Sequence, residues 1–117
     1  MSVESGILRT RDGIAINIDF FERRDMVEIR ALPGGASYII LYTKLLLLAV
    51  QSDGYLRYKG LKGSIEEELS DDLNEDEGKL RGTIKALIGH QLAVACGNGD
   101  YFLPEAAQDE TDLFDRE

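Results

Sequence analysis

The chain has 117 residues, a formal net charge of −9 and one cysteine. This length suffices for one domain with a single hydrophobic core, and one cysteine excludes both an internal disulfide and a zinc site built on cysteines. The first ten residues show neither the basic start nor the apolar run of a signal peptide. We therefore expect a cytoplasmic protein that is not bound to a membrane.

The acidity is concentrated in two segments. Residues 64–77 contain eight acids and no base, and residues 105–117 contain six acids and one base. These segments together carry a charge of −13, so the remaining residues have a net charge of +4. The overall charge argues against binding to nucleic acid, which depends on Lys and Arg, but its distribution weakens that argument.

The chain begins with little pattern and then alternates. Residues 1–13 are expected to form a loose arm. Residues 14–20 alternate apolar with small or polar side chains, which is typical of a short strand with one buried face. The side chains predicted to face inward are Ile14, Ile16, Ile18 and Phe20.

A short helix is predicted next, over residues 22–32. Met26 and Ile29 lie on one face of this helix, with Arg23 on the outward face. Pro33 and the two glycines after it end the helix, because proline and glycine favour turns.

Residues 38–50 are the most apolar stretch of the chain, and only Thr43 and Lys44 interrupt it. Its leucine content and the turn residues on either side predict a central helix of about four turns. Because it is apolar on all faces, we expect it to be buried on almost all sides. It is shorter than the roughly 20 residues that a membrane span requires.

The second half predicts a short strand, two helices and a hairpin. The strand covers residues 55–58, and Ser64 caps a helix that continues to about Leu73. A second amphipathic helix covers residues 77–91, and residues 92–103 form a β-hairpin around a Gly-Asn-Gly-Asp turn. The apolar positions expected to be buried on the two helices are Ile65, Leu69, Leu73, Leu80, Ile84, Leu87, Ile88 and Leu92.

This order of elements is typical of a winged helix-turn-helix, an α+β fold that is mainly α with a small β-sheet, here with an additional N-terminal strand. In that fold the second of two consecutive helices enters the major groove, and the hairpin after it forms the wing. The outward face of the helix at 77–91 carries Lys79, Gly82 and Lys85, with Arg81 nearby. After its first residue this helix contains no acid.

Several segments also carry a resemblance to a known family. Asp19-Phe20-Phe21 ends the first strand, Pro33-Gly34-Gly35 forms a turn, residues 42–49 have the pattern YxKLLLLA, and residues 54–57 read Gly-Tyr-Leu-Arg. In this order they resemble the N-terminal domain of phage replisome organisers, which is related to the winged-helix N-terminal domain of DnaD-like primosomal proteins. The similarity covers roughly residues 14–103. Most of these residues belong to the core, so the resemblance identifies a fold and a family rather than a site.

The resemblance implies a protein that helps to assemble a replisome at a phage or prophage origin. Such a domain binds double-stranded DNA at an origin-like site, forms a homo-oligomer, or does both. In the family a C-terminal region recruits replication proteins such as a helicase loader, and we expect that region to be missing here, either because the chain is one domain of a longer protein or because the protein is naturally short. We divide the chain into an arm at 1–13, a winged-helix domain at 14–104, and an acidic tail at 105–117 that forms a short helix or is disordered.

Eight residues are candidate DNA contacts. They are Lys79, Arg81, Gly82 and Lys85 on the second helix, Arg57 in the short strand with Lys59 and Lys62 after it, and Asn98 in the hairpin turn. The basic residues of the helix equally fit an ordinary solvated face. For Arg57, Lys59 and Lys62 we favour the interpretation that they are ordinary surface residues over the interpretation that they form a second phosphate contact.

Four other features fit structural roles better than chemical ones. His90 is expected to cap the helix or to be half-buried, and Cys96 to be buried and inert. Of Tyr101 and Phe102 in the hairpin, one is expected to pack on the core and the other could stack on DNA. The acids at 64–77 lack the spacing of a calcium loop, so they predict a solvated face and no metal site.

An enzymatic function is not indicated. The Gly-Asn-Gly turn is not followed by a helix and cannot form a phosphate-binding loop, and the one histidine has no evident nucleophile beside it. No cofactor is expected. Two hypotheses remain: a DNA-binding module whose second helix lies in the major groove, and an assembly module that self-associates or docks a basic partner without binding DNA.

Overall fold

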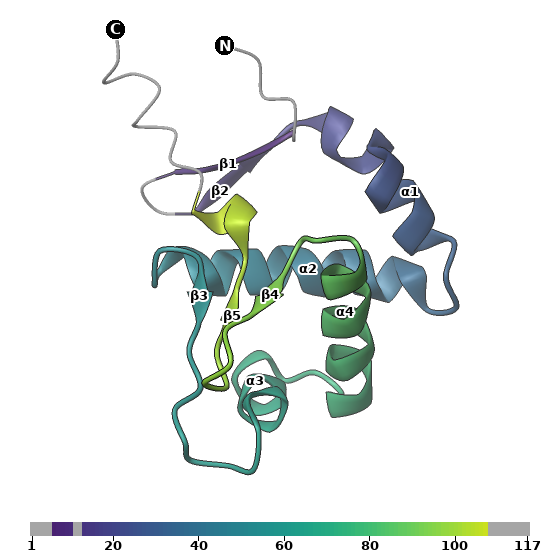
Figure 1. The fold of residues 1–117 in the computed structure, drawn as a ribbon. Coiled ribbons are helices and arrows are strands. Elements are labelled where there is room, and N and C mark those ends of the chain that lie inside the picture. The colour runs from purple at the N-terminus through teal and green to yellow at the C-terminus, as the bar shows by residue number, and fades with distance from the viewer. Residues whose placement is uncertain (1–5, 11–12, 108–117) are drawn as a thin grey trace, which may run out of the picture.

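The computed structural model describes residues 6–10 and 13–107. Helix α2 (Gly35–Val50) crosses the middle of the molecule (Figure 1). Helix α1 (Arg24–Arg30) and a two-stranded sheet lie on one side of it. Helices α3 (Ile65–Leu73) and α4 (Glu77–Gly89) and a three-stranded sheet lie on the other. No helix in the described ranges is long and apolar enough to cross a membrane.

The predicted central helix is confirmed, and it begins three residues earlier than expected. Gly34 adopts a left-handed conformation with φ 76° just before it. Gly35 starts the helix against α1, where an added Cβ would lie 2.1 Å from the carbonyl oxygen of Ile29. The expectation of burial on almost all sides is wrong, because Ile40 is 57% exposed and Leu47 is 47% exposed. The other elements therefore leave one stripe of α2 uncovered.

The predicted strand at 14–20 is shorter than expected. Strand β2 (Ile14–Ile16) ends where Asn17 caps a 3-10 helix, η1 (Ile18–Glu22), by accepting a hydrogen bond from the Asp19 backbone N–H at 2.9 Å. This local side-chain bond competes with strand pairing. The change of conformation leaves Ile18 75% exposed, and Ile16 is exposed as well, so the inward orientation predicted for both was wrong. Phe20 is fully buried, as predicted.

The first thirteen residues are not all a loose arm. Strand β1 (Ile7–Arg9) pairs antiparallel with β2, with Ile7 opposite Ile16. Ile7 is fully buried in the core. The expectation of a loose arm is therefore wrong for this strand, and residues 1–5 and 11–12 lie outside the described residues.

Helix α1 buries Met26 and Ile29 as predicted, but Arg23 just before it does not face outward. Its guanidinium lies 2.5 Å from the Glu105 carboxylate and 2.8 Å from Asp25. Glu105 belongs to a second 3-10 helix, η2 (Pro104–Ala106), which was expected to be the start of the tail. The packed domain therefore continues through Ala106, which is fully buried, and the rest of the predicted tail from residue 108 lies outside the described residues.

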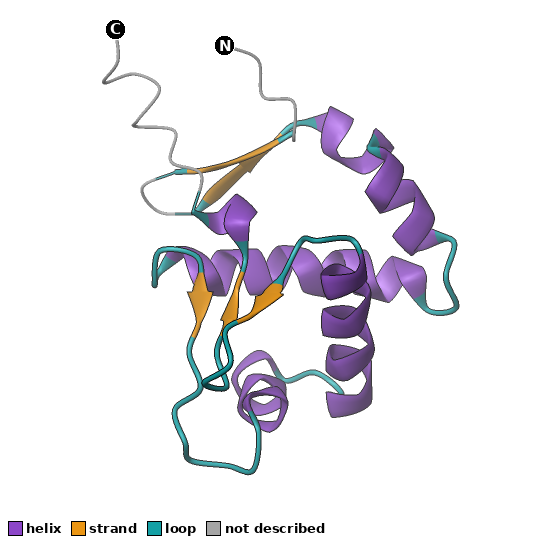
Figure 2. Ribbon diagram, in the orientation of Figure 1, coloured by secondary structure: helices purple, strands orange, loops and turns teal. Residues whose placement is uncertain are grey.

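The three-stranded sheet confirms the predicted hairpin with shorter strands. It is formed by β3 (Tyr55–Leu56), β4 (Val94–Ala95) and β5 (Tyr101–Phe102), drawn in orange in Figure 2. Strand β5 lies between the other two and pairs antiparallel with both, with Tyr55 and Val94 each opposite Phe102. This order places β3 beside the hairpin that follows α4.

Helices α3 and α4 begin and end close to the predicted residues. Ser64 caps α3, and the Asp76 carboxylate accepts a hydrogen bond from the Lys79 N–H at 2.9 Å and caps α4. Of the positions predicted to be buried, Leu73 is only partly buried. The predicted positions that are buried are Ile65, Leu69, Leu80, Ile84, Leu87 and Leu92. Ile88 was predicted to be buried and is 41% exposed. The order of helices, turn and hairpin confirms an α+β, winged-helix-like fold.

Candidate nucleic-acid interface

Helix α4 carries four of the predicted contacts, and they differ in their surroundings. Lys79 and Lys85 are exposed and form no ion pair within the described residues. Arg81 turns toward α3, with its guanidinium 2.6 Å from Glu77, 3.6 Å from Glu66 and 3.0 Å from the Ser64 hydroxyl. The hydrogen bond to Glu77 is the main cause that raises the pKa of Arg81, with further contributions from the charge of Glu66. The charge of Arg81 is therefore already paired with acids of the same chain.

Gly82 has a packing role. A Cβ built on it would lie 2.6 Å from the Tyr38 hydroxyl oxygen on α2. Its small size lets α4 approach the beginning of α2. A glycine at this place is thus explained by helix packing, without a ligand.

The basic residues after β3 are paired with acids as well. Arg57 lies 3.2 Å from Asp100, and Lys59 lies 3.1 Å from Asp72. Lys62 forms an ion pair with Asp71. These contacts lower the capacity of the three cations to bind phosphate, because a bound anion would have to compete with the acid.

The loop at residues 59–63 is held by one carboxylate, that of Glu68. It accepts hydrogen bonds from the backbone N–H groups of Lys59 at 2.7 Å, Leu61 at 2.7 Å and Lys62 at 3.1 Å. Burial acts to raise the pKa of Glu68, but these three donors outweigh it and hold the pKa below its ordinary value. Glu68 therefore stays charged and fixes the loop.

Most carboxylates of the acidic segment at 64–77 have a hydrogen-bond or ion-pair partner within the fold. Seven of its eight carboxylates accept a hydrogen bond or form an ion pair. The seven are Glu66, Glu68, Asp71, Asp72, Glu75, Asp76 and Glu77, and their partners include Lys44, Lys59, Lys62 and Arg81. Only Glu66 and Glu68 are buried, and the other six acids remain exposed or partly exposed, so the predicted solvated face is confirmed for most of the segment and wrong for these two residues. No group of three possible metal ligands occurs among the described residues.

Asn98 shapes the turn of the wing. Its side-chain oxygen accepts a hydrogen bond from the Asp100 backbone N–H at 3.0 Å. Asp100 is buried, and its carboxylate accepts a hydrogen bond from the Tyr58 N–H at 2.8 Å. This bond is the main cause that lowers the pKa of Asp100. The wing turn is thereby tied to β3, and the Asn98 side chain is already engaged.

Two residues beside the interface complete the comparison with the sequence. His90 is half-buried at the C-terminal end of α4, with its Nδ1 3.6 Å from a Glu28 carboxylate oxygen, and its N–H bonds to the Ala86 carbonyl at 3.1 Å. This agrees with the predicted cap. Cys96 was predicted to be buried and is exposed in the wing, where both residues of β4 before it, Val94 and Ala95, are exposed as well.

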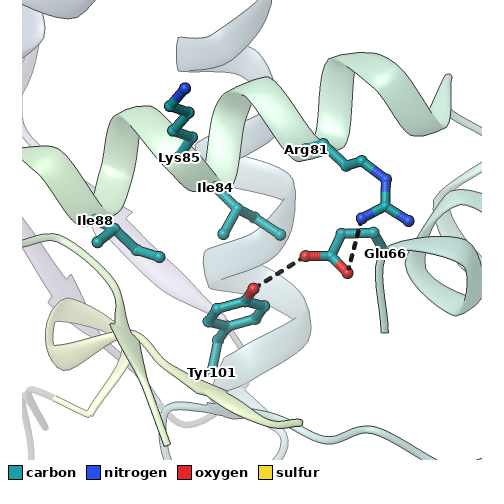
Figure 3. A pocket seen from close by; sticks show the side chains of 6 residues that line it. All are labelled: Glu66, Arg81, Ile84, Lys85, Ile88 and Tyr101. Atoms are coloured by element: carbon teal, nitrogen blue, oxygen red, sulfur yellow. Dashed lines mark hydrogen bonds and ion pairs between the residues drawn. The ribbon is translucent and has the colours of Figure 1, made fainter. Parts of the chain in front are cut away.

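A groove of about 290 Å³ lies between α4, α3 and β5 (Figure 3). We call it the α4 groove, and it is lined by Glu66, Arg81, Ile84, Lys85, Ile88 and Tyr101. The Tyr101 hydroxyl donates to a Glu66 carboxylate oxygen at 2.9 Å, which together with the larger effect of burial raises the pKa of Tyr101. The apolar floor and the two basic side chains thus lie next to one carboxylate.

A comparison with protein families identifies the family of this chain. Residues 14–112 match the N-terminal phage replisome organiser family. The chain belongs to this family. The match spans nearly the whole described domain and assigns a role in phage replication. Comparisons with curated proteins and with solved structures gave no match.

In this replisome organiser domain, the tertiary structure divides the eight predicted contacts into two sets. Lys79 and Lys85 are available on α4, whereas Gly82 packs on Tyr38 and the other five are engaged with acids. Sequence analysis missed the α4 groove because Glu66 and Tyr101 are 35 positions apart. A signal was present in Ile84 and Ile88, two isoleucines four residues apart that alternate with Arg81 and Lys85 on one side of the helix.

Proposed function

We propose that this domain binds double-stranded DNA during phage replication, with α4 in the major groove and the wing against the backbone. The observation that carries the proposal is the state of Lys79 and Lys85, which are exposed on α4 and have no acidic partner within the described residues. In winged helices the corresponding helix reads the groove. The domain acts in the cytoplasm at an origin-like site, together with replication proteins such as a helicase loader.

The acidity of the chain is compatible with this function. Five of the carboxylates at 64–77 form ion pairs with four cations of the same fold, so about half of the charge of the segment is compensated locally. Repulsion between separate charges is screened over about 8 Å at physiological salt. A phosphate at Lys79 or Lys85 therefore meets two unpaired cations near it and few unpaired acids.

The test is fluorescence anisotropy of a labelled duplex, titrated with the full chain at several salt concentrations. Lys79→Glu together with Lys85→Glu is expected to weaken binding at least about tenfold. The plot of log affinity against log salt should become shallower by about 1.8, because each lost phosphate contact removes about 0.9.

A control for net charge uses Arg24→Glu, which changes the total charge by −2, half of the change in the double variant. The Arg24 side chain is 92% exposed on α1 and pairs only with Glu28 among the described residues. It should change the affinity no more than about twofold. A loss in log affinity for Arg24→Glu that is half of the loss in the double variant would mean that only net charge matters, and would contradict a specific role for α4.

One observation favours a second function, assembly. Ile40 and Leu47 are seven residues apart on the uncovered stripe of α2 and are both about half exposed. Apolar residues at this spacing on a helix can pack against another helix. In this alternative the domain forms a homo-oligomer or docks a replication protein, without binding DNA.

Light scattering of the full chain after size-exclusion chromatography tests the alternative. An oligomer that dissociates in the variant with Ile40→Ser and Leu47→Ser would support it. A monomer at all concentrations would contradict the hypothesis that the domain self-associates.

A further inference from the structure

We propose that the α4 groove binds an unpaired nucleobase, so that the domain holds a single DNA strand as well as a duplex. The inference rests on the proposed function and extends it by naming a second form of the ligand. The groove lies beside the helix that would enter the duplex, and its lining residues were not among the predicted contacts except for Arg81 and Lys85.

The floor of the groove is suited to a flat apolar face. Ile84 and Ile88 lie on α4 one turn apart, and Figure 3 shows the Tyr101 ring across from them. Ile88 is 41% exposed although the periodicity of α4 predicts burial, so this apolar side chain is displayed in the groove. A base removed from its stack gains by covering such surface.

The polar groups of the groove match the edge and the backbone of a nucleotide. Each DNA base carries at least one N–H on its Watson–Crick edge, and the Glu66 carboxylate is an acceptor for it. Glu66 is nearly buried and already holds the Tyr101 hydroxyl at 2.9 Å, which fixes its position, and a carboxylate can accept about four hydrogen bonds. Lys85 at the rim has no ion pair within the described residues and is available to a phosphate.

The size of the groove limits the ligand. At about 290 Å³ it lies at the lower end of the range for small-molecule sites, roughly 300–1,000 Å³. It therefore accepts one base, whereas a base pair is too large and keeps its edges hidden inside the duplex. Because the contacts are an apolar face, one acceptor and one cation, binding depends little on base identity.

The experiment compares a labelled 15-nucleotide single strand with the duplex of the same sequence, using the full chain. Ile88→Ser removes apolar floor without changing charge and should lower the affinity for the single strand about five- to tenfold. The affinity for the duplex should change less than twofold. Ile18→Ser is the matched control, because Ile18 is 75% exposed on η1 and outside the groove, and it should affect neither ligand.

A second measurement locates the ligand without a variant. In ¹H–¹⁵N spectra, a thymidine hexanucleotide should shift the backbone amides of Ile84, Ile88 and Tyr101. The peptide of residues 108–117, which contains Leu113-Phe114 between acids, is added separately. Shifts of these amides with the peptide and none with the hexanucleotide would overturn the inference and assign the groove to an acidic peptide.

The outcomes separate the two proposals. Single-strand binding that is unchanged in Ile88→Ser overturns the nucleobase site, and duplex binding that still depends on Lys79 and Lys85 then leaves the proposed function in place. Single-strand binding that depends on Ile88, with no duplex binding, retains the site and overturns the duplex function. Failure of both ligands to bind overturns both.

Discussion

The guanidinium of Arg23 lies 2.5 Å from the carboxylate of Glu105, 82 positions later in the chain. This contact joins the start of α1 to η2, which lies near the end of the described chain. Tyr42 on α2 donates its hydroxyl to the same carboxylate, and burial, followed by the charge of Glu105, raises the pKa of Tyr42, so the hydroxyl stays protonated. Three segments of the fold thus meet at Glu105.

We expect Glu105→Ala to lower the free energy of unfolding by about 3 kcal/mol, because it leaves the buried Tyr42 hydroxyl without its acceptor and removes one of the two carboxylates that pair with Arg23. Urea unfolding followed by circular dichroism measures this. The matched control is Glu28→Ala, which breaks the exposed pair with Arg24 and should cost less than about 1 kcal/mol. Similar losses in the two variants would show that the Arg23–Glu105 contact has no special weight.

The lowered pKa of Asp100 predicts a dependence of stability on pH. The folded state holds this carboxyl charged through the Tyr58 N–H, so below the ordinary carboxyl pKa of about 3.9 the unfolded chain binds more protons than the folded one. The stabilisation is therefore fully present above that pH and is lost as the pH falls through the lowered pKa.

Asp100→Asn isolates this contribution. The variant should be less stable than the natural chain at pH 7, and the difference between their urea midpoints should shrink toward pH 3. A difference that stays constant with pH would mean that the Asp100 charge does not contribute, and that the variant acts through its altered hydrogen bonding alone.

Gly35→Ala tests the close contact between α1 and α2. Its Cβ would lie 2.1 Å from the Ile29 carbonyl oxygen and 2.6 Å from that of Arg30, and both are backbone atoms that cannot turn away. We expect a loss of at least about 3 kcal/mol in the free energy of unfolding, because α1 or α2 must move. Thermal unfolding provides the measurement.

Gly89→Ala is the control for helix propensity. No atom lies within 4 Å of a Cβ built at Gly89, so this change should raise stability by up to about 1 kcal/mol. A Gly35→Ala variant as stable as the natural chain would contradict the packing described here.

Cys96 provides a direct probe of the wing. The thiol is exposed, so an aromatic disulfide reagent should modify it in the folded protein at a rate within about tenfold of that in urea. Excess duplex should slow the reaction severalfold if the wing lies against the backbone, as proposed. A thiol that reacts only in urea would contradict the exposed position, and a rate unaffected by bound duplex would remove the wing from the interface.

The sequence by itself determined the elements whose signals are local. The apolar spacing of Leu80, Ile84 and Leu87 identifies α4, and Ser64 marks the start of α3, because helix faces and caps depend on residues only three or four positions apart. The fold class also follows from the order of such elements, and the family follows from the resemblance carried by the residue motifs at 19–21, 33–35, 42–49 and 54–57. Alternation was misleading at residues 14–20, where the Asn17 side chain favours a 3-10 helix over a longer strand.

Only the tertiary structure decided which charges remain available. Lys59 and Lys85 are the same residue type in the sequence. In the structure Lys59 forms an ion pair with Asp72 of α3, whereas Lys85 forms no ion pair within the described residues. The pairing of Arg23 with Glu105 and of Tyr101 with Glu66 likewise joins positions far apart in the chain. The physical reason is that side-chain charges and hydrogen bonds act over a few ångströms in space, and chain order does not specify which distant residues the packing of helices brings within that range.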